Sequence, residues 1–355
     1  MNLVALLRKE VVSKRHRILT VLFVMVVLPS VFAFTTVTFQ NVIPRDTPVA
    51  VVPANDNVSS QNMDIAVGGI TLYSDPKTYD SLDSALRALH REAVYAVIEV
   101  PPRLTRKTQN ARFNLYIEGA MVPYKEPSES VTSLLGYYLR TRLPADVTVE
   151  RRVVGEEKTF PEYLVPVFFM GLVVLFSFTY LPYDLSKEED VLDRLRTQTS
   201  LDSVVAAKLV FFSALLVLPL LTFAAVSKYL GYSVELLSPL ALGVYLLTFL
   251  YLSSVSLAVT VVSKFSALGR FVNVVLMLGV VGFSSFVFPV GFFSPLRGYV
   301  ARRMPTYYSM VIVRGASIKD LSASFYTDWL AGLALLTLVS LAALKLSIEH
   351  YRRTA

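Results

Sequence analysis

The sequence predicts an α-helical polytopic membrane protein with six transmembrane helices and an extracellular α/β domain. Hydrophobic residues make up 54% of the 355 residues and charged residues only 17%, whereas soluble domains contain about 25% charged residues. In addition, several charge-free stretches are long enough to cross a bilayer, since about 20 apolar helical residues span roughly 30 Å of hydrocarbon.

The charge-free stretches define the six spans. They predict transmembrane helices at residues 18–40, 163–183, 209–227, 236–263, 271–296 and 329–348. The first stretch is longer than the apolar part of a signal peptide, which is about 7 to 15 residues, so it is expected to remain as a helix. The last one continues past Lys345, whose long side chain can reach the membrane surface.

Positive charges in the short flanks of the spans predict the orientation. With the N-terminus inside, the inner flanks hold 14 Lys and Arg residues and the outer flanks hold 6. Because cytoplasmic flanks carry the excess of positive charge, we expect a multi-pass protein of the cell membrane with both termini in the cytoplasm. Five basic residues within residues 297–328, between the last two spans, depart from this rule.

Residues 1–17 precede the first span. Their leucines and Val11 fall on one helical face, and most of their basic residues fall elsewhere. This pattern predicts an amphipathic helix that lies on the inner membrane surface in contact with lipid. A plain cytoplasmic extension of the first span is the alternative.

Residues 41–162 are long enough to form a domain with its own core. Short β-type runs alternate with helical spacing in this segment, which indicates a small α/β domain. Strands are expected at residues 48–53, 70–73, 93–100 and 113–117, and helices at residues 81–91 and 128–142. Asn57 begins an Asn-X-Ser sequon and is a candidate glycosylation site, although such tripeptides also occur by chance.

The sequence lacks the motifs of the common enzyme classes. It has no GxxxxGK[ST] phosphate loop, no HExxH, no GxSxG and no CxxC. Cysteine is absent and histidine occurs only three times, so catalytic residues, a cofactor and a metal site are not expected. The net charge of +7 lies at the edges of the apolar stretches and does not indicate nucleic acid.

The charge-free stretches leave the centre of the membrane without an ionisable group. Ion-coupled carriers place such groups there to bind or relay the driving ion. An ion-driven mechanism is therefore disfavoured, and an external source of energy is favoured.

Residues 184–208 connect the second and third spans on the cytoplasmic side. Ser186 and Glu189 fit a capping box, in which the serine hydroxyl and the glutamate satisfy free N–H groups at the start of a helix. Glu188 also lies near the positive end of this helix. The pattern therefore predicts a short helix that begins at Ser186.

Leu192 and Leu195 form an apolar stripe on the same short helix, and Thr199 begins a second box-like pattern before the third span. A capped helix along the inner membrane surface suits the docking of a soluble partner. A solvated connector fits the pattern equally well.

At this loop the sequence resembles the type-2 ABC transporter permeases. Glu189-Asp190-Val191-Leu192-Asp193 stands where that family has Glu-Gly-Thr-Leu-Glu, and Lys208 matches the lysine that opens the third span. Asp190 replaces the usual glycine, and Thr199 replaces the usual proline.

Other segments resemble the same family in the same order. PVAVVPAND and DSALRALHREAVYAVIEVPP are similar to parts of the extracellular domain in the subgroup with a large insertion after the first span. The segment FVFPVGFFSP is similar to the outer re-entrant region of that family, which we expect at residues 297–328 and just before them. Two later segments, Met304-Pro305-Thr306-Tyr307 and Val313-Arg314-Gly315, are similar to the motifs that follow that region. Met304 replaces the usual asparagine.

This resemblance implies the permease subunit of an ABC-type exporter, which is not itself an enzyme. Its partners would be a separate ATPase and a second permease, either another copy or a paralogue. The charge-free spans favour a hydrophobic or amphipathic substrate. The residues implied in coupling to the ATPase are Ser186, Glu188, Glu189, Leu192, Leu195 and Thr199.

A membrane receptor or assembly factor is the alternative. Such a protein would bind a ligand with the extracellular domain and would transport nothing. A neighbouring gene that encodes a phosphate-loop ATPase would favour the permease.

Overall fold

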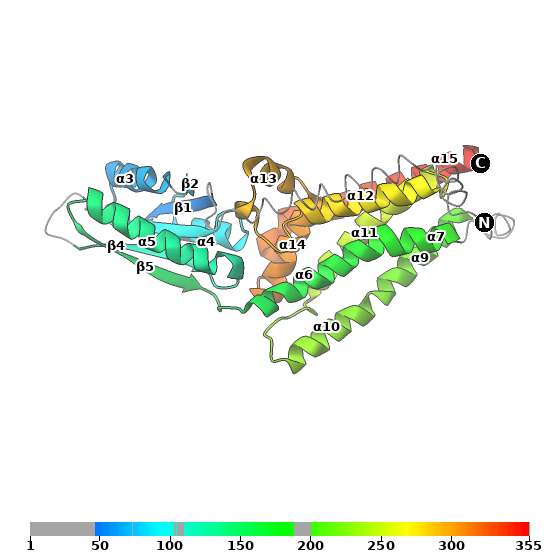
Figure 1. Ribbon diagram of the computed structural model, residues 1–355, viewed down its shortest axis with the longest axis horizontal. Coiled ribbons are helices and arrows are strands. Elements are labelled where there is room, and N and C mark those ends of the chain that lie inside the picture. The colour runs from blue at the N-terminus through cyan, green and yellow to red at the C-terminus, as the bar shows by residue number, and fades with distance from the viewer. Residues whose placement is uncertain (1–46, 73, 103, 105–109, 188–199, 355) are drawn as a thin grey trace, which may run out of the picture.

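The computed structural model describes residues 47–72, 74–102, 104, 110–187 and 200–354. It is elongated, with an α/β domain at one end and a helical bundle at the other (Figure 1). We call the end of the bundle next to the domain the domain-side end, and the opposite one the far end. The helices predicted at residues 1–17 and 18–40 lie outside the described residues.

A five-stranded sheet with the order β2-β1-β3-β4-β5 forms the centre of the domain. β1 is parallel to β2 and to β3, β3 is antiparallel to β4, and β4 is parallel to β5. The strands are β1 (Thr47–Pro53), β2 (Ser74–Thr78), β3 (Ala96–Val100), β4 (Asn110–Glu118) and β5 (Asp146–Val154).

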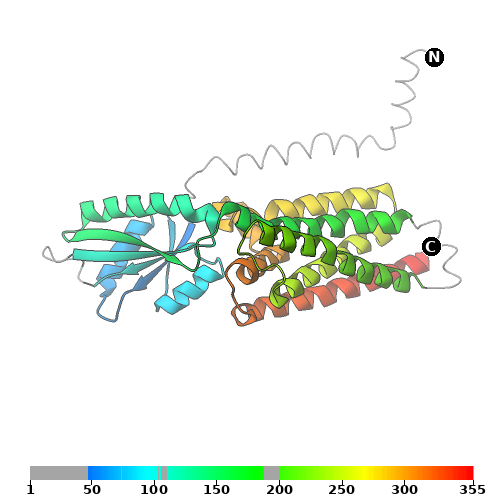
Figure 2. The same ribbon diagram turned by 90° about the horizontal axis from the view of Figure 1, so that it is seen from below.

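Helices cover both faces of this sheet (Figure 2). They are α3 (Ser60–Ile70), α4 (Leu82–His90) and α5 (Lys125–Arg142). Val49 and Val51 belong to the same core as α3 and α5, whereas Ala50 and Val52 pack with α4. Successive side chains of a strand point to opposite faces, so a strand that is covered on both sides reads as an unbroken apolar run.

Most elements predicted for this domain are confirmed. β1, α4, β3, β4 and α5 overlap the expected ranges, and the hydroxyl of Ser81 caps α4 by accepting from the N–H of Ser84. The strand predicted at residues 70–73 is wrong, because Ile70 is buried as the last residue of α3. Neither α3 nor β5 is predicted from the sequence. β5 is an edge strand with the polar run Glu150-Arg151-Arg152, which lacks the apolar pattern of a buried strand.

The bundle contains four helical stretches, within the described residues, that are long and apolar enough to cross a membrane. They are Phe160–Lys187, Leu201–Tyr229, Pro239–Val262 and Ala323–Thr354. These stretches overlap the second, third, fourth and sixth predicted spans. The individual elements are α6 (Phe160–Leu175), the π-helix η4 (Phe176–Tyr180), α7 (Leu181–Lys187), α9 (Leu201–Leu215), α10 (Val217–Tyr229), α11 (Pro239–Val262), α12 (Ala267–Phe283), η5 (Val290–Phe292), α13 (Pro295–Ala301), α14 (Pro305–Ile318), η6 (Ala323–Tyr326) and α15 (Thr327–Thr354).

The fifth predicted span, residues 271–296, is wrong in its second half. α12 is an apolar helix that ends at Phe283. The chain then turns at Ser285, which has a φ of 54°, and continues into η5 and α13. The apolar residues that prolonged the prediction, such as Phe286 and Val290, are buried within the protein. Hydropathy alone does not distinguish a protein interior from lipid.

The segment from 284 to 304, which we call the connecting segment, joins α12 to α14 at the domain-side end (Figure 1). It leads into α14, in which every residue from Thr306 to Ile318 is buried except Tyr308. α14 packs against α11 and α6. α14 lies within residues 297–328, so that this part of the predicted re-entrant region is a buried helix.

Candidate coupling site

Six residues are implied in coupling to the ATPase. α7, which contains Ser186, ends at the far end of the bundle, where α9 begins (Figure 1). Ser186 belongs to the described part of the chain. The other five lie outside the described residues: Glu188, Glu189, Leu192, Leu195 and Thr199.

The prediction that Ser186 caps a helix at its start is wrong. Ser186 lies in the last turn of α7, and its hydroxyl donates to the carbonyl oxygen of Pro182 at 2.8 Å. A capping serine has a non-helical backbone and accepts a hydrogen bond from an N–H group. α7 continues through Ser186 because Leu181 and Leu185 are fully buried against the bundle, so the second predicted span extends one turn further than its charge-free stretch.

An ion pair joins the two helices on either side of residues 188–199. The Nζ atom of Lys208 in α9 donates to Oδ2 of Asp184 in α7 at 2.5 Å. The Lys208 side chain is only 12% exposed and that of Asp184 is 38% exposed. The pair is therefore partly shielded from water, which strengthens it relative to a surface pair.

A second ionic contact connects α9 to the end of α15. Asp202, in the first turn of α9, accepts from Nζ of Lys345 at 2.9 Å and from the guanidinium of Arg352. Lys345 therefore has a carboxylate partner rather than only the membrane surface. Together the two contacts join α7 to α9 and α9 to α15 at the far end of the bundle.

A π-helix interrupts the α6–α7 rod close to this end. π-helical turns are rare and leave backbone groups to be satisfied from outside the helix. The carbonyl oxygen of Ser177 in η4 accepts from the hydroxyl of Ser256 in α11 at 2.5 Å, and the hydroxyls of Ser253 and Ser177 lie 3.2 Å apart. Such hydrogen bonds between membrane helices contribute about 0.6 to 2 kcal/mol each.

Asn273 extends this polar contact to α12. Its Nδ2 atom donates to the carbonyl oxygen of Ser256 at 3.1 Å and to the hydroxyl of Thr260 at 3.0 Å, and its side chain is fully buried. The π-helix is thus held by polar side chains from α11, which are held in turn by α12. These hydrogen bonds join η4, α11 and α12 within the bundle.

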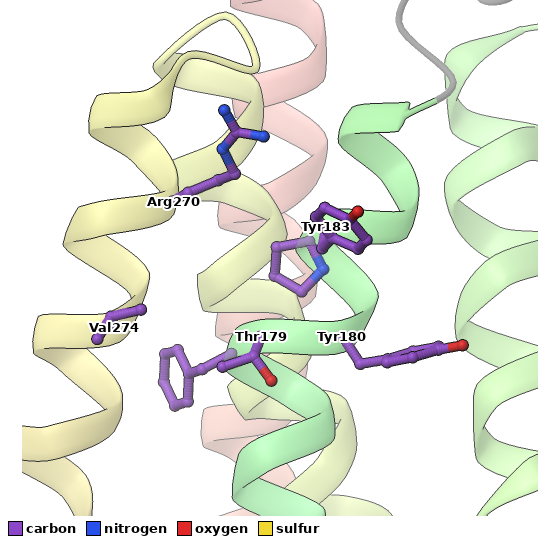
Figure 3. Close-up of a pocket in the computed structure, with 7 residues that line it drawn as sticks. Thr179, Tyr180, Tyr183, Arg270 and Val274 are labelled. Carbon is purple, nitrogen blue, oxygen red and sulfur yellow. The ribbon is translucent and has the colours of Figure 1, made fainter.

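A cavity of about 300 Å³ lies beside the π-helix (Figure 3). Its walls come from η4, α7 and α12, and are formed by Phe178, Thr179, Tyr180, Pro182, Tyr183, Arg270 and Val274. Most of these side chains are apolar or aromatic, and Arg270 adds a positive charge. Sites of this composition suit apolar or amphipathic molecules.

Comparison with known proteins gives one family-level match. A family model described as ABC-2 family transporter protein matches residues 16–346. The matched region includes the α/β domain, the ion pair of Lys208 with Asp184, the π-helix and the cavity, whereas Arg352 lies beyond it. No curated protein and no solved structure matches the chain.

Proposed function

Because the chain belongs to the ABC-2 family of transporter proteins, we propose that it is the permease subunit of an ABC-type exporter, powered by a separate ATPase subunit. It is a membrane-embedded transporter subunit. In the proposed complex, two permeases, either identical or paralogous, work with two ATPase subunits. Closure of the ATPases on ATP pushes residues 188–199, and the spans then shift between inward-open and outward-open states.

The ionic contacts at the far end of the bundle support this mechanism most directly. A displacement of residues 188–199 reaches α7 and α9 through Asp184 and Lys208, and reaches α15 through Asp202. The coupling role of Ser186, Glu188, Glu189, Leu192, Leu195 and Thr199 belongs to this proposal.

The cavity in Figure 3 supports a hydrophobic or amphipathic substrate. Aromatic and aliphatic side chains cover most of its wall, and transfer of apolar surface into such a site is favourable by roughly 25 cal/mol per Å². Its position next to the π-helix places it where a bend of the α6–α7 rod would change its width.

A reconstitution experiment tests the proposal. The purified chain is expected to hydrolyse no ATP, since it has no phosphate loop. With the ATPase that copurifies with it, in lipid vesicles, hydrolysis should rise when a fluorescent amphipathic dye is added, and the dye should move across the membrane. Hydrolysis by the chain free of other polypeptides, or failure to recover any ATPase, would contradict the two-subunit proposal.

The proposed orientation is tested separately with single cysteines, for which the cysteine-free chain is a clean background. Asn57→Cys, at an exposed position of the domain, should react with an impermeant thiol reagent added to intact cells. Arg353→Cys, exposed at the end of α15, should react only after the membrane is opened. The reverse pattern would show that the orientation is inverted.

A further inference from the structure

A cluster of charged and titratable side chains, four of them buried and His90 partly exposed, connects the α/β domain to the bundle. His90, Glu92 and Glu118 come from the domain, and Arg314 and Lys319 come from α14 and its C-cap. The side chains of Glu92 and Arg314 are 0% and 1% exposed, and those of Glu118 and Lys319 are each 3% exposed. We call these five residues the buried charge cluster.

Arg314 is the centre of the buried charge cluster. Its guanidinium binds Glu92 through two bonds, from Nε to Oε1 at 3.0 Å and from Nη2 to Oε2 at 2.6 Å. Its Nη1 donates to the carbonyl oxygens of Ser285 at 3.2 Å and Phe286 at 3.1 Å. The planar fork of arginine suits such paired contacts. One side chain thus holds α14, the connecting segment and the domain together.

Lys319 completes the charge balance. Its Nζ atom lies 3.7 Å from Glu92 and 3.8 Å from Glu118, and donates to the carbonyl oxygen of His90 at 3.1 Å. Burial alone raises the pKa of Glu118, but Lys319 and the hydrogen bond with His90 outweigh burial and hold this pKa below its usual range. The cations of Arg314 and Lys319 thus face the carboxylates of Glu92 and Glu118. Removal of one partner would leave a buried charge unpaired, which is strongly unfavourable.

The backbone of Glu92 indicates that its side chain is needed there. Glu92 has a φ of 57°, in the left-handed region, which disfavours residues with a Cβ and which glycine adopts without strain. A glycine could make the turn between α4 and β3 but could not pair with Arg314. A strained residue of this kind is a reason to look for a function.

Two further contacts hold the α/β domain close to the bundle. Tyr95, just before β3, accepts a hydrogen bond at its hydroxyl from the N–H of Gly291 at 3.2 Å, and a Cβ added at Gly291 would lie 2.6 Å from the Tyr95 ring. Arg91 forms a paired contact with Asp328, at 2.7 and 2.8 Å, and its guanidinium lies 4.3 Å from the ring centre of Trp329. The domain therefore contacts both the connecting segment and the start of α15.

We propose that Glu92 is a positioning residue of the transport path: through Arg314 it fixes the connecting segment and α14, so that the α/β domain and this end of the bundle form one gate that moves as a unit. The inference rests on the proposed function. The ion pair of Glu92 and Arg314 is buried, and Arg314 donates four hydrogen bonds, two to Glu92 and two to the connecting segment. This contact therefore stays intact while the far end of the bundle changes shape. The domain is then a working part of the gate and not a detachable receptor.

Two substitutions of Glu92, one that removes its charge and one that keeps it, test this role in the reconstituted complex of permease and ATPase. Glu92→Gln is expected to lower dye transport at least about ten-fold while the ATPase still copurifies and still hydrolyses ATP, because the energy input remains but the gate is no longer held. Glu92→Asp, which keeps the charge, should restore part of the transport. The matched control is Glu99→Gln, because the described partners of the Glu99 carboxylate, Asn114 and Tyr116, both belong to the domain. Transport by this variant should equal that of wild type.

A distance measurement tests the inference without altering the buried charge cluster. Labels on Tyr137→Cys in the domain and Leu296→Cys in α13 occupy exposed positions, 72% and 77% respectively. Their separation is expected to stay constant to within about 2 Å between the nucleotide-free and ATP-trapped states, whereas the separation of Leu296→Cys and Arg353→Cys should change. A change of several ångströms in the first pair would overturn the inference, and so would full transport by Glu92→Gln.

Failure of the proposed function has a different signature. If the wild-type complex shows no ATP-dependent transport, the permease assignment fails before any variant is compared. A second outcome is that the wild-type complex transports, whereas the Glu92→Gln chain gives less folded protein and its complex loses both ATP hydrolysis and transport. The Glu92 side chain is then only structural, and the positioning role is rejected.

Discussion

Changing Leu192 and Leu195 together to Glu is expected to separate the permease from its ATPase. If both leucines enter a groove on the partner, the change removes apolar contact worth about 1.5 to 3 kcal/mol per buried leucine and adds unpaired charge to a dry interface. A factor of ten in affinity corresponds to about 1.4 kcal/mol, so the complex should fall apart at ordinary concentrations. The measurement is the recovery of ATPase with wild-type and variant chains at matched expression.

The control for this variant is the pair Leu192→Met and Leu195→Met, which keeps the apolar surface and should retain the ATPase. If residues 188–199 are only a solvated connector, the glutamates are added to an exposed segment and change stability by less than about 0.5 kcal/mol. Unchanged recovery and unchanged dye-stimulated hydrolysis would then remove the coupling role, and the receptor interpretation would gain support.

Reversing the charge of Lys208 is expected to uncouple ATP hydrolysis from transport. Lys208→Glu places a carboxylate against Asp184 in α7, so that the two helices flanking residues 188–199 repel each other. Exposed ion pairs contribute about 0.2 to 1 kcal/mol, and breaking a fully buried pair costs about 3 to 5 kcal/mol; this partly shielded pair lies between those limits. We expect at least about a ten-fold loss of transport, measured with the dye in vesicles.

Two companion variants make this result specific. The double change Asp184→Lys with Lys208→Glu restores opposite charges and should recover most of the transport. Lys228→Glu makes the same chemical change at an exposed position near the other end of the same helical stretch and should have little effect. Equal losses in all three variants would mean that the ion pair between α7 and α9 has no special role.

The elements of the bundle were predictable where one local property decides the structure. A helix that crosses lipid must lack charge over its whole length, so the stretches behind α6, α10, α11 and α15 are evident from composition. The same rule fails after Phe283, because Phe286 and Val290 are apolar for a different reason: they fill the junction with the domain. In the domain, the sequence pattern does not predict β5, because an edge strand can carry charged residues.

The ionic contacts depend on partners that lie far apart in the chain. Lys208 and Asp184 are separated by 24 residues, and Arg314 and Glu92 by 222. No periodicity links such pairs, so the sequence suggests Lys208 and Arg314 only by resemblance and does not suggest their carboxylates. The sequence did show five basic residues between the last two predicted spans, and the structure accounts for two of them: Arg314 and Lys319 pair with carboxylates of the domain.

The order of synthesis gives the buried charge cluster a further consequence. The domain carrying Glu92 and Glu118 leaves the ribosome well before α14 does, and domains generally fold as units during synthesis, N-terminal first. Arg314 and Lys319 therefore reach a binding site that is already formed, and the last third of the bundle assembles on the domain. A chain from which residues 47–154 were deleted would carry Arg314 and Lys319 without the carboxylates of Glu92 and Glu118, and the domain-side end of the bundle would hold two unpaired cations.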